Sequence, residues 1–94
     1  MKQIFLSSEF KHHFKLRISK NELLTREYKE SVEAFLEDKT LMNDHPLEDV
    51  MSNFRAFWIN DDYRVVYQEK EKYYLFTDIG THEQVYRGSK RNVN

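Results

Sequence analysis

Apolar residues in the first part of the chain follow two different patterns. A compact apolar run predicts a short strand over residues 2–7. From Phe10 to Ile18, apolar residues then recur every four positions with basic side chains between them, which is the spacing of an amphipathic helix. The chain is therefore expected to begin with a strand that leads into a helix.

A second helical stripe begins after Ser19. Ser19 and Glu22 have the spacing of a capping box, in which two side chains bond the free backbone N–H groups at the start of a helix. Apolar positions keep a helical spacing as far as about Asp38, and the acidic residues between them are expected to face solvent. The pattern predicts a second helix from Ser19 to Asp38.

From residue 54 onward the chain is rich in aromatic and β-branched residues, which favour strands. Three such runs span Phe54–Ile59, Tyr63–Gln68 and Tyr73–Ile79, and the polar turns between them are short enough for antiparallel hairpins. Residues 41–47 lose the helical pattern around a proline and are expected to form a loop. Both faces of the strands carry apolar residues, so the pattern leaves open which face the helices cover.

Together these elements predict an α+β fold, with one strand, two helices and a three-stranded antiparallel meander in one mostly antiparallel sheet. Only two Gly and one Pro occur, and no linker is visible, so residues 1–94 are expected to form a single domain. The lack of cysteine excludes disulfides and thiolate metal sites. No apolar run reaches the roughly 20 residues that cross a bilayer, so we expect a cytoplasmic protein with no membrane partner.

The net charge of −1 is unusual for a domain that binds nucleic acid mainly by electrostatic attraction. The charge is unevenly distributed along the chain, however. Residues 1–20 carry five basic and one acidic side chain, residues 21–62 four and eleven, and residues 63–94 six and four. A basic surface therefore requires that the two ends of the chain lie side by side.

Four segments in the second half stand out by residue type and spacing: Asp44-His45-Pro46-Leu47, Phe54-Arg55-Ala56-Phe57-Trp58-Ile59, Asp62-Tyr63-Arg64-Val65-Val66-Tyr67, and Gly80-Thr81-His82 with Tyr86 four residues later. Together they resemble the YafQ branch of the RelE/ParE superfamily of toxins. The resemblance implies a RelE-like fold and a ribosome-dependent messenger-RNA endonuclease that a partner antitoxin neutralises.

The resemblance also implies roles for individual residues. Cleavage of RNA by attack of a 2′-hydroxyl on the adjacent phosphorus needs a base, an acid and cationic donors for the phosphorane. His45 and His82 match the acid/base positions of the family. Asp62 matches a catalytic carboxylate, and Tyr86 matches an aromatic residue of the site. This chemistry needs no cofactor, and no convincing metal-ligand spacing is present, so the enzyme is expected to be metal-independent.

Two positions depart from the YafQ pattern. Arg64 stands where that branch usually has an apolar residue, whereas RelE carries an arginine there for phosphate stabilisation. Trp58 stands where YafQ-type toxins place a histidine, and an indole cannot transfer protons but does stack on RNA bases. We therefore expect Arg64 to bind phosphate and Trp58 to contact RNA. Arg55 and Arg87 are further candidates for RNA contact.

The same side chains also have purely structural interpretations. His82 can satisfy backbone groups in a turn, and His45 can be an ordinary surface residue of the loop. Arg64 can pair across strands with Asp78. Tyr86 can belong to the core.

The alternative function is that of a ParE-like or catalytically silent relative that binds a protein target such as gyrase, and a purely structural interaction protein is a third hypothesis. The expected partners are a cognate antitoxin, the ribosome and messenger RNA. Operator DNA is expected only through the antitoxin.

Overall fold

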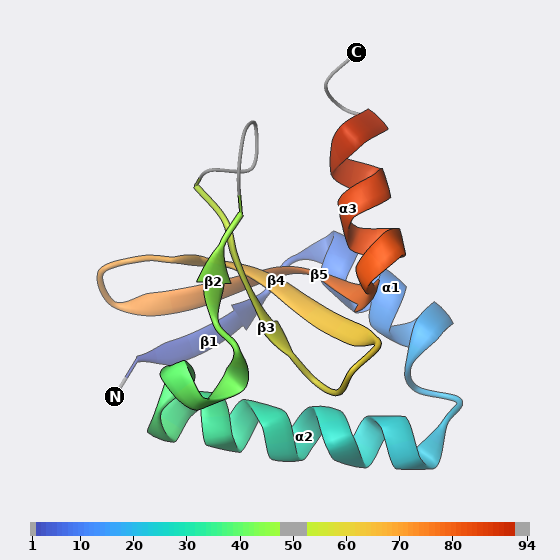
Figure 1. The fold of residues 1–94 in the computed structure, drawn as a ribbon, viewed down its shortest axis with the longest axis horizontal. Coiled ribbons are helices and arrows are strands. Elements are labelled where there is room, and N and C mark those ends of the chain that lie inside the picture. The colour runs from blue at the N-terminus through green and yellow to red at the C-terminus, as the bar shows by residue number, and fades with distance from the viewer. Residues whose placement is uncertain (1, 48–52, 92–94) are drawn as a thin grey trace.

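Residues 2–47 and 53–91 are described by the structure, a computed structural model. At its centre is a five-stranded sheet with the order β1-β5-β4-β3-β2 (Figure 1). The strands are β1 (Gln3–Leu6), β2 (His45–Pro46), β3 (Arg55–Trp58), β4 (Tyr63–Glu69) and β5 (Tyr73–Thr81). The helices are α1 (Ser8–Arg17), α2 (Glu22–Glu37) and α3 (His82–Arg91), with a short 3-10 helix η1 (Lys39–Met42) after α2.

The strand pairing confirms the predicted α+β fold with one mostly antiparallel sheet. β3, β4 and β5 form the antiparallel meander, and β1 adds to β5 in the parallel direction. Besides the short 3-10 helix η1, two elements were not predicted. The first is β2, which has only two residues and pairs with β3 at the edge of the sheet. Pro46 is compatible with that position because an edge strand does not need every backbone N–H.

The second unpredicted element is α3, which continues directly from the end of β5. The predicted arrangement of one strand, two helices and a meander therefore lacked the helix that carries His82 and Tyr86. None of the helices in the described residues is long and apolar enough to cross a membrane.

The start of α2 differs from the predicted one. Asn21, not Ser19, is the N-cap, and its side chain accepts a hydrogen bond from the backbone N–H of Leu24 at 3.0 Å. Ser19 instead donates its hydroxyl to the carbonyl of Lys15, in the last turn of α1. The capping-box interpretation of Ser19 is wrong because this residue still belongs to the closure of the preceding helix.

The part of β5 that extends beyond its pairing with β1 is covered by α1 and by Ser7, the residue before α1. β1 pairs only with residues 73–76 of β5, which leaves the carbonyl groups farther along without a strand partner. The backbone N–H of Ser7 binds the carbonyl of Phe76, its hydroxyl binds that of Thr77, and Arg17 binds that of Ile79. These contacts satisfy the edge of the sheet and fix α1 beside the end of β5.

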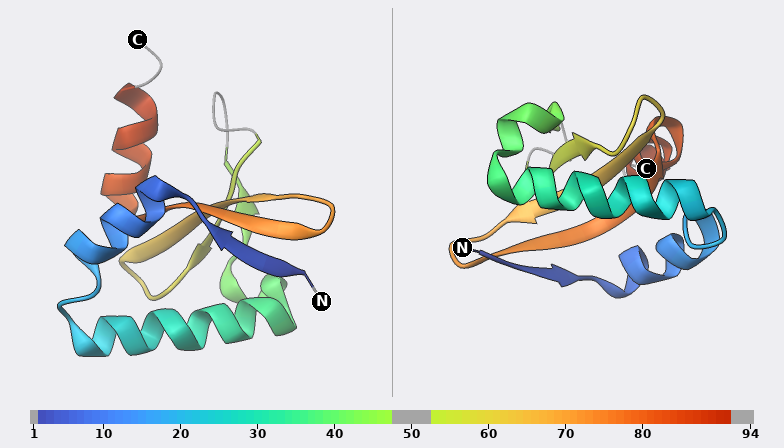
Figure 2. Two further views of the ribbon diagram at one scale, coloured as in Figure 1. Left: turned by 180° about the vertical axis from the view of Figure 1, so that it is seen from behind. Right: turned by 90° about the horizontal axis from the view of Figure 1, so that it is seen from below.

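The two faces of the sheet have different roles. One face packs against α1 and α2, and α2 crosses it with α1 alongside (Figure 2). Its centre is the stacked pair Phe35 and Phe57, whose ring centroids are 4.4 Å apart. The other residues of this core are Phe10, Ile18, Leu24, Ile59, Val65, Tyr67, Phe76 and Ile79.

The opposite face is only partly covered. A small cluster of Leu47, Ala56, Val66 and Val85 anchors the start of α3 there. The register places Ala56 opposite Val66 and Trp58 opposite Arg64. Trp58 and Arg64 therefore lie on the face that α1 and α2 leave open, which settles the question that the apolar pattern could not decide.

Candidate active site

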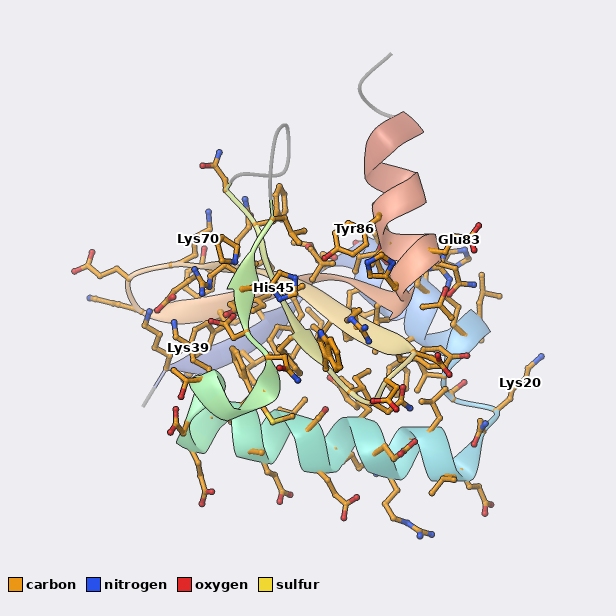
Figure 3. All side chains as sticks on the ribbon, viewed as in Figure 1. Lys20, Lys39, His45, Lys70, Glu83 and Tyr86 are labelled. Carbon is orange, nitrogen blue, oxygen red and sulfur yellow. The ribbon has the colours of Figure 1, made fainter. Side chains whose placement is uncertain are left out.

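His45, His82 and Tyr86 come together between β2 and the first turn of α3. The Nε2 atom of His45 lies 3.1 Å from the hydroxyl of Tyr86. The rings of His82 and Tyr86 are in contact, with centroids 4.3 Å apart. His45 and Tyr86 lie on the same side of the sheet, whereas Lys39 and Lys70 lie at its far end (Figure 3). Three predicted site residues from two distant segments thus form one cluster.

A capping box starts α3 and sets the position of His82. The backbone N–H of Thr81 binds the side-chain oxygen of Gln84 at 2.8 Å, and the N–H of Gln84 binds the hydroxyl of Thr81 at 3.2 Å. The backbone N–H of His82 donates to the carbonyl of Asp62 at 2.9 Å. The Thr-x-x-Gln spacing is therefore a helix-start signal that the sequence contained and our prediction missed.

Gly80 makes room for this arrangement. A Cβ atom at this position would lie 2.7 Å from Nη1 of Arg17 and 2.7 Å from Oε1 of Gln84. Both distances are shorter than any ordinary contact, so a side chain at residue 80 would displace one partner of the capping box. The glycine of the Gly-Thr-His motif is thus explained by packing at the base of α3.

His45 is held in one tautomer. Its Nδ1 atom lies 2.7 Å from the backbone carbonyl of Asn43, and because a carbonyl only accepts, Nδ1 must carry a hydrogen. In the neutral ring Nε2 is then unprotonated and accepts from the hydroxyl of Tyr86. Asn43 reaches this position with φ 56° and ψ 31°, a left-handed conformation that asparagine tolerates better than most residues.

The hydroxyl of Tyr86 stays protonated at neutral pH. Burial raises the pKa of Tyr86 above its usual value, and the positive charge of Arg64 offsets only part of that effect. The raised pKa means that Tyr86 is a hydrogen-bond donor to His45 and not a tyrosinate base.

Arg64 is almost fully buried, with 6% of its surface exposed. Its guanidinium lies 4.0 Å from the centre of the Trp58 ring, and Nη1 donates to the carbonyls of Asn60 and Tyr63. Burial lowers the pKa of Arg64, and the nearby charge of Asp62 acts in the opposite direction. The group is nevertheless a cation at any physiological pH.

The alternative pairing of Arg64 with Asp78 is not formed. Asp78 instead accepts from His13 at 2.6 Å, with Arg17 at 3.6 Å. Together with Glu9, His13 and Asp78 are the one group among the described residues whose donor atoms lie close enough, within 4.8 Å, to hold a metal ion. The positive charge of Arg17 already faces the carboxylate of Asp78. The three residues lie on α1 and β5 and are not part of the cluster of His45, His82 and Tyr86.

The other predicted site residues differ in how they relate to the cluster of His45, His82 and Tyr86. Asp62 is exposed in the turn between β3 and β4 and contacts His82 through its backbone. Arg55 is not part of the cluster, because its guanidinium forms a forked ion pair with Asp44. The side chain of Arg87 lies outside the described residues, one position after Tyr86.

Sequence reasoning gave no role to Asp44, although it is one of the most constrained residues near the site. Its carboxylate is 3% exposed and binds Nη2 of Arg55 at 2.6 Å and the hydroxyl of Tyr67 by a short hydrogen bond. Burial raises the pKa of Tyr67, and the hydrogen bond to Asp44 raises that of Arg55. This network fixes the backbone directly before His45.

Comparison with known proteins places this geometry in a family. The family model of a bacterial toxin of type II toxin-antitoxin systems, YafQ, matches residues 2–87. No curated protein matches the chain.

Solved structures agree with the family match. YafQ from E. coli strain BL21(DE3) is 19% identical with a TM-score of 0.73, covering 92% of this chain and 99% of its own. YafQ in the E. coli DinJ-YafQ complex is 23% identical with a TM-score of 0.70, and covers 92% and 99%. A metal-bound toxin from Helicobacter pylori is 26% identical with a TM-score of 0.70, and covers 90% and 99%.

The fold and the family match agree over most of the chain, and the motifs that first suggested them supply the clustered histidines. The chain belongs to the YafQ family of toxins of bacterial type II toxin-antitoxin systems, the mRNA interferase class that its motifs resemble.

Proposed function

We propose that this chain is a ribosome-dependent endoribonuclease that cleaves messenger RNA in the cytoplasm without a metal ion. The observation that carries the proposal is the cluster of His45, Tyr86 and His82 on the sheet face that also holds Arg64. Two imidazoles that can accept or donate a proton and one permanent cation are the parts that 2′-hydroxyl attack on a phosphate requires.

The fixed tautomer of His45 suggests a division of labour. Nε2 of His45 is an acceptor, so it takes the proton of the attacking 2′-hydroxyl as that group replaces Tyr86 at the ring. The oxygen then bonds to phosphorus, Arg64 neutralises the phosphorane, and His82 gives a proton to the departing 5′-oxygen. The products are a 2′,3′-cyclic phosphate and a free 5′-hydroxyl.

The remaining candidates have supporting roles in this proposal. Asp62 positions His82 through the bond between its carbonyl and the N–H of that residue. Arg87 is retained as an RNA contact because it follows Tyr86 on α3. Arg55 is left out, since Asp44 holds its guanidinium.

The proposed partners are the ribosome, messenger RNA and a cognate antitoxin. A related YafQ has been solved in complex with DinJ, which supports an antitoxin for this chain. We expect contact with operator DNA only through that antitoxin.

A translation extract supplied with a defined messenger tests the proposal. The chain should cut the messenger and leave a 2′,3′-cyclic phosphate, and EDTA should not change the rate. His45→Gln and His82→Gln should each slow cleavage about 10²- to 10⁴-fold, the usual effect of losing a general acid or base. His12→Gln is the matched control, because His12 is exposed on α1 and outside the cluster.

Two results would contradict the proposal. Cleavage that persists in both site variants would show that these histidines are not the acid and base. An intact messenger with the wild-type chain would favour the alternative function, in which the chain binds a protein target such as gyrase.

A further inference from the structure

Arg64 is held at three points. β3 and β4 place Trp58 and Arg64 directly opposite each other, so the indole lies 4.0 Å from the guanidinium carbon. Nη1 donates to the carbonyl of Asn60 at 2.9 Å and to that of Tyr63 at 3.1 Å. The ring and the two carbonyls together fix both the position and the plane of the guanidinium.

Arg64 lacks the kind of ion pair that Arg17 and Arg55 form with a carboxylate. Arg17 lies beside Asp78, and Arg55 is paired with Asp44. Within the described part of the chain, no carboxylate forms an ion pair with Arg64, and no acceptor is bound by its Nε or Nη2. A buried cation that forms no ion pair is stabilised by an anion that binds it, and the Nε and Nη2 atoms of the guanidinium match two oxygens of a phosphate.

One face of the Trp58 ring is therefore already occupied by the guanidinium of Arg64. A cation over the face of an indole is attracted by the ring's quadrupole, and this attraction grows when water is excluded. Because Arg64 is 6% exposed, the contact lies at the desolvated end of that range. Trp58 is thus placed to act on RNA through the arginine.

We propose that Trp58 is a positioning residue that holds Arg64 in the orientation in which it binds a phosphate group of RNA. The inference rests on the proposed function and replaces base stacking as the role of Trp58. Without the indole, the positive charge of Arg64 should remain in place, but its guanidinium should no longer be held in one orientation. The effects of substituting Trp58 and Arg64 should therefore not be additive.

Fluorescence provides a test that needs no RNA cleavage. Trp58 is the only tryptophan, so its emission reports on this contact alone. Inorganic phosphate should change the emission of the wild-type chain and not that of Arg64→Met, whereas the uncharged nucleoside adenosine should have no effect. Lys20→Met, which removes an exposed cation elsewhere, should respond to phosphate as the wild-type chain does. A response to adenosine and none to phosphate would overturn the inference in favour of stacking on a base.

Cleavage of ribosome-bound messenger provides the second arm, as a double-mutant cycle. Trp58→Leu should slow cleavage about tenfold, which corresponds to about 1.4 kcal/mol. In the Arg64→Met background the same substitution should have almost no further effect, and Trp58→Phe should recover part of the rate. Equal losses in both backgrounds would refute the inference.

The two arms separate this inference from the proposed function. If no messenger is cut, the proposed function fails and fluorescence still decides whether Trp58 and Arg64 form a phosphate site. If messenger is cut but the two substitutions act independently, the function stands and the positioning role is wrong. Circular dichroism of each variant establishes that a loss does not come from unfolding.

Discussion

Asp44→Asn should destabilise the protein and disturb the site although the Asp44 carboxylate forms no hydrogen bond with His45 or His82. The carboxylate is 3% exposed and holds the Arg55 guanidinium and the hydroxyl of Tyr67. In the variant, the amide nitrogen is a donor that faces other donors, and the guanidinium loses its counter-ion. Removal of one partner of a fully buried pair costs about 3–5 kcal/mol.

The expected cost is smaller here, because the Arg55 side chain is 32% exposed and water replaces part of the lost interaction. We expect the free energy of unfolding to fall by about 2–3 kcal/mol, and the melting temperature by roughly 8–24 °C for a chain of this size. Urea titration and thermal melting, both followed by circular dichroism, measure these changes.

Arg55→Met is the matched variant for this network. The double variant Asp44→Asn with Arg55→Met should lose less stability than the two single losses added together, because neither charge remains to be left without a partner. A loss below about 0.5 kcal/mol in Asp44→Asn, or additive losses in the double variant, would refute the network as described.

Three further substitutions test other parts of the structure. Asn21→Ala should cost about 1 kcal/mol as the loss of a helix cap, whereas Ser19→Ala should be close to neutral; equal effects in urea titrations would contradict the observed cap. Lys2 and Lys39 lower the pKa of Glu69 from 4.5 to about 2, so its contribution to stability is present above pH 4.5 and is lost as the pH falls toward 2. Glu69→Gln should therefore unfold at less urea than the wild-type chain at pH 6 and at a similar concentration at pH 2; a constant difference would exclude this titration. Gly80→Ala should slow cleavage while the sheet stays folded, because its Cβ displaces the capping box under His82; an unchanged rate would show that the box does not set the site.

The elements with a regular apolar period were predictable from sequence. The helix around Phe35 was found because one helical apolar period runs through it, and the strands over residues 63–68 and 73–79 were found because they are rich in aromatic and β-branched residues. The ends of elements were less predictable. Ser19 and Asn21 both suit a helix cap, and the choice between them depends on the turn that closes α1.

The site was predictable in its residue types and not in its contacts. His45, His82 and Tyr86 were recognised by family resemblance, but nothing local shows that residues 45 and 86 meet. Their meeting depends on β2, a two-residue strand without any periodic signal, and on α3, whose exposed start carries few apolar residues. The roles of Asp44 and Asn43 depend on tertiary hydrogen bonds, so no sequence pattern predicts them.

The contact between His45 and Tyr86 has a consequence for how toxicity arises during folding. It joins residues 41 positions apart, and it forms only when β5 has paired with β4 and α3 has started at the end of β5. Such distant pairs require prior closure of long loops, which makes them slow to form. A partly folded chain therefore holds all of the site's residues but no assembled site. Harm to the host cell should follow the concentration of fully folded molecules and not the amount of chain synthesised.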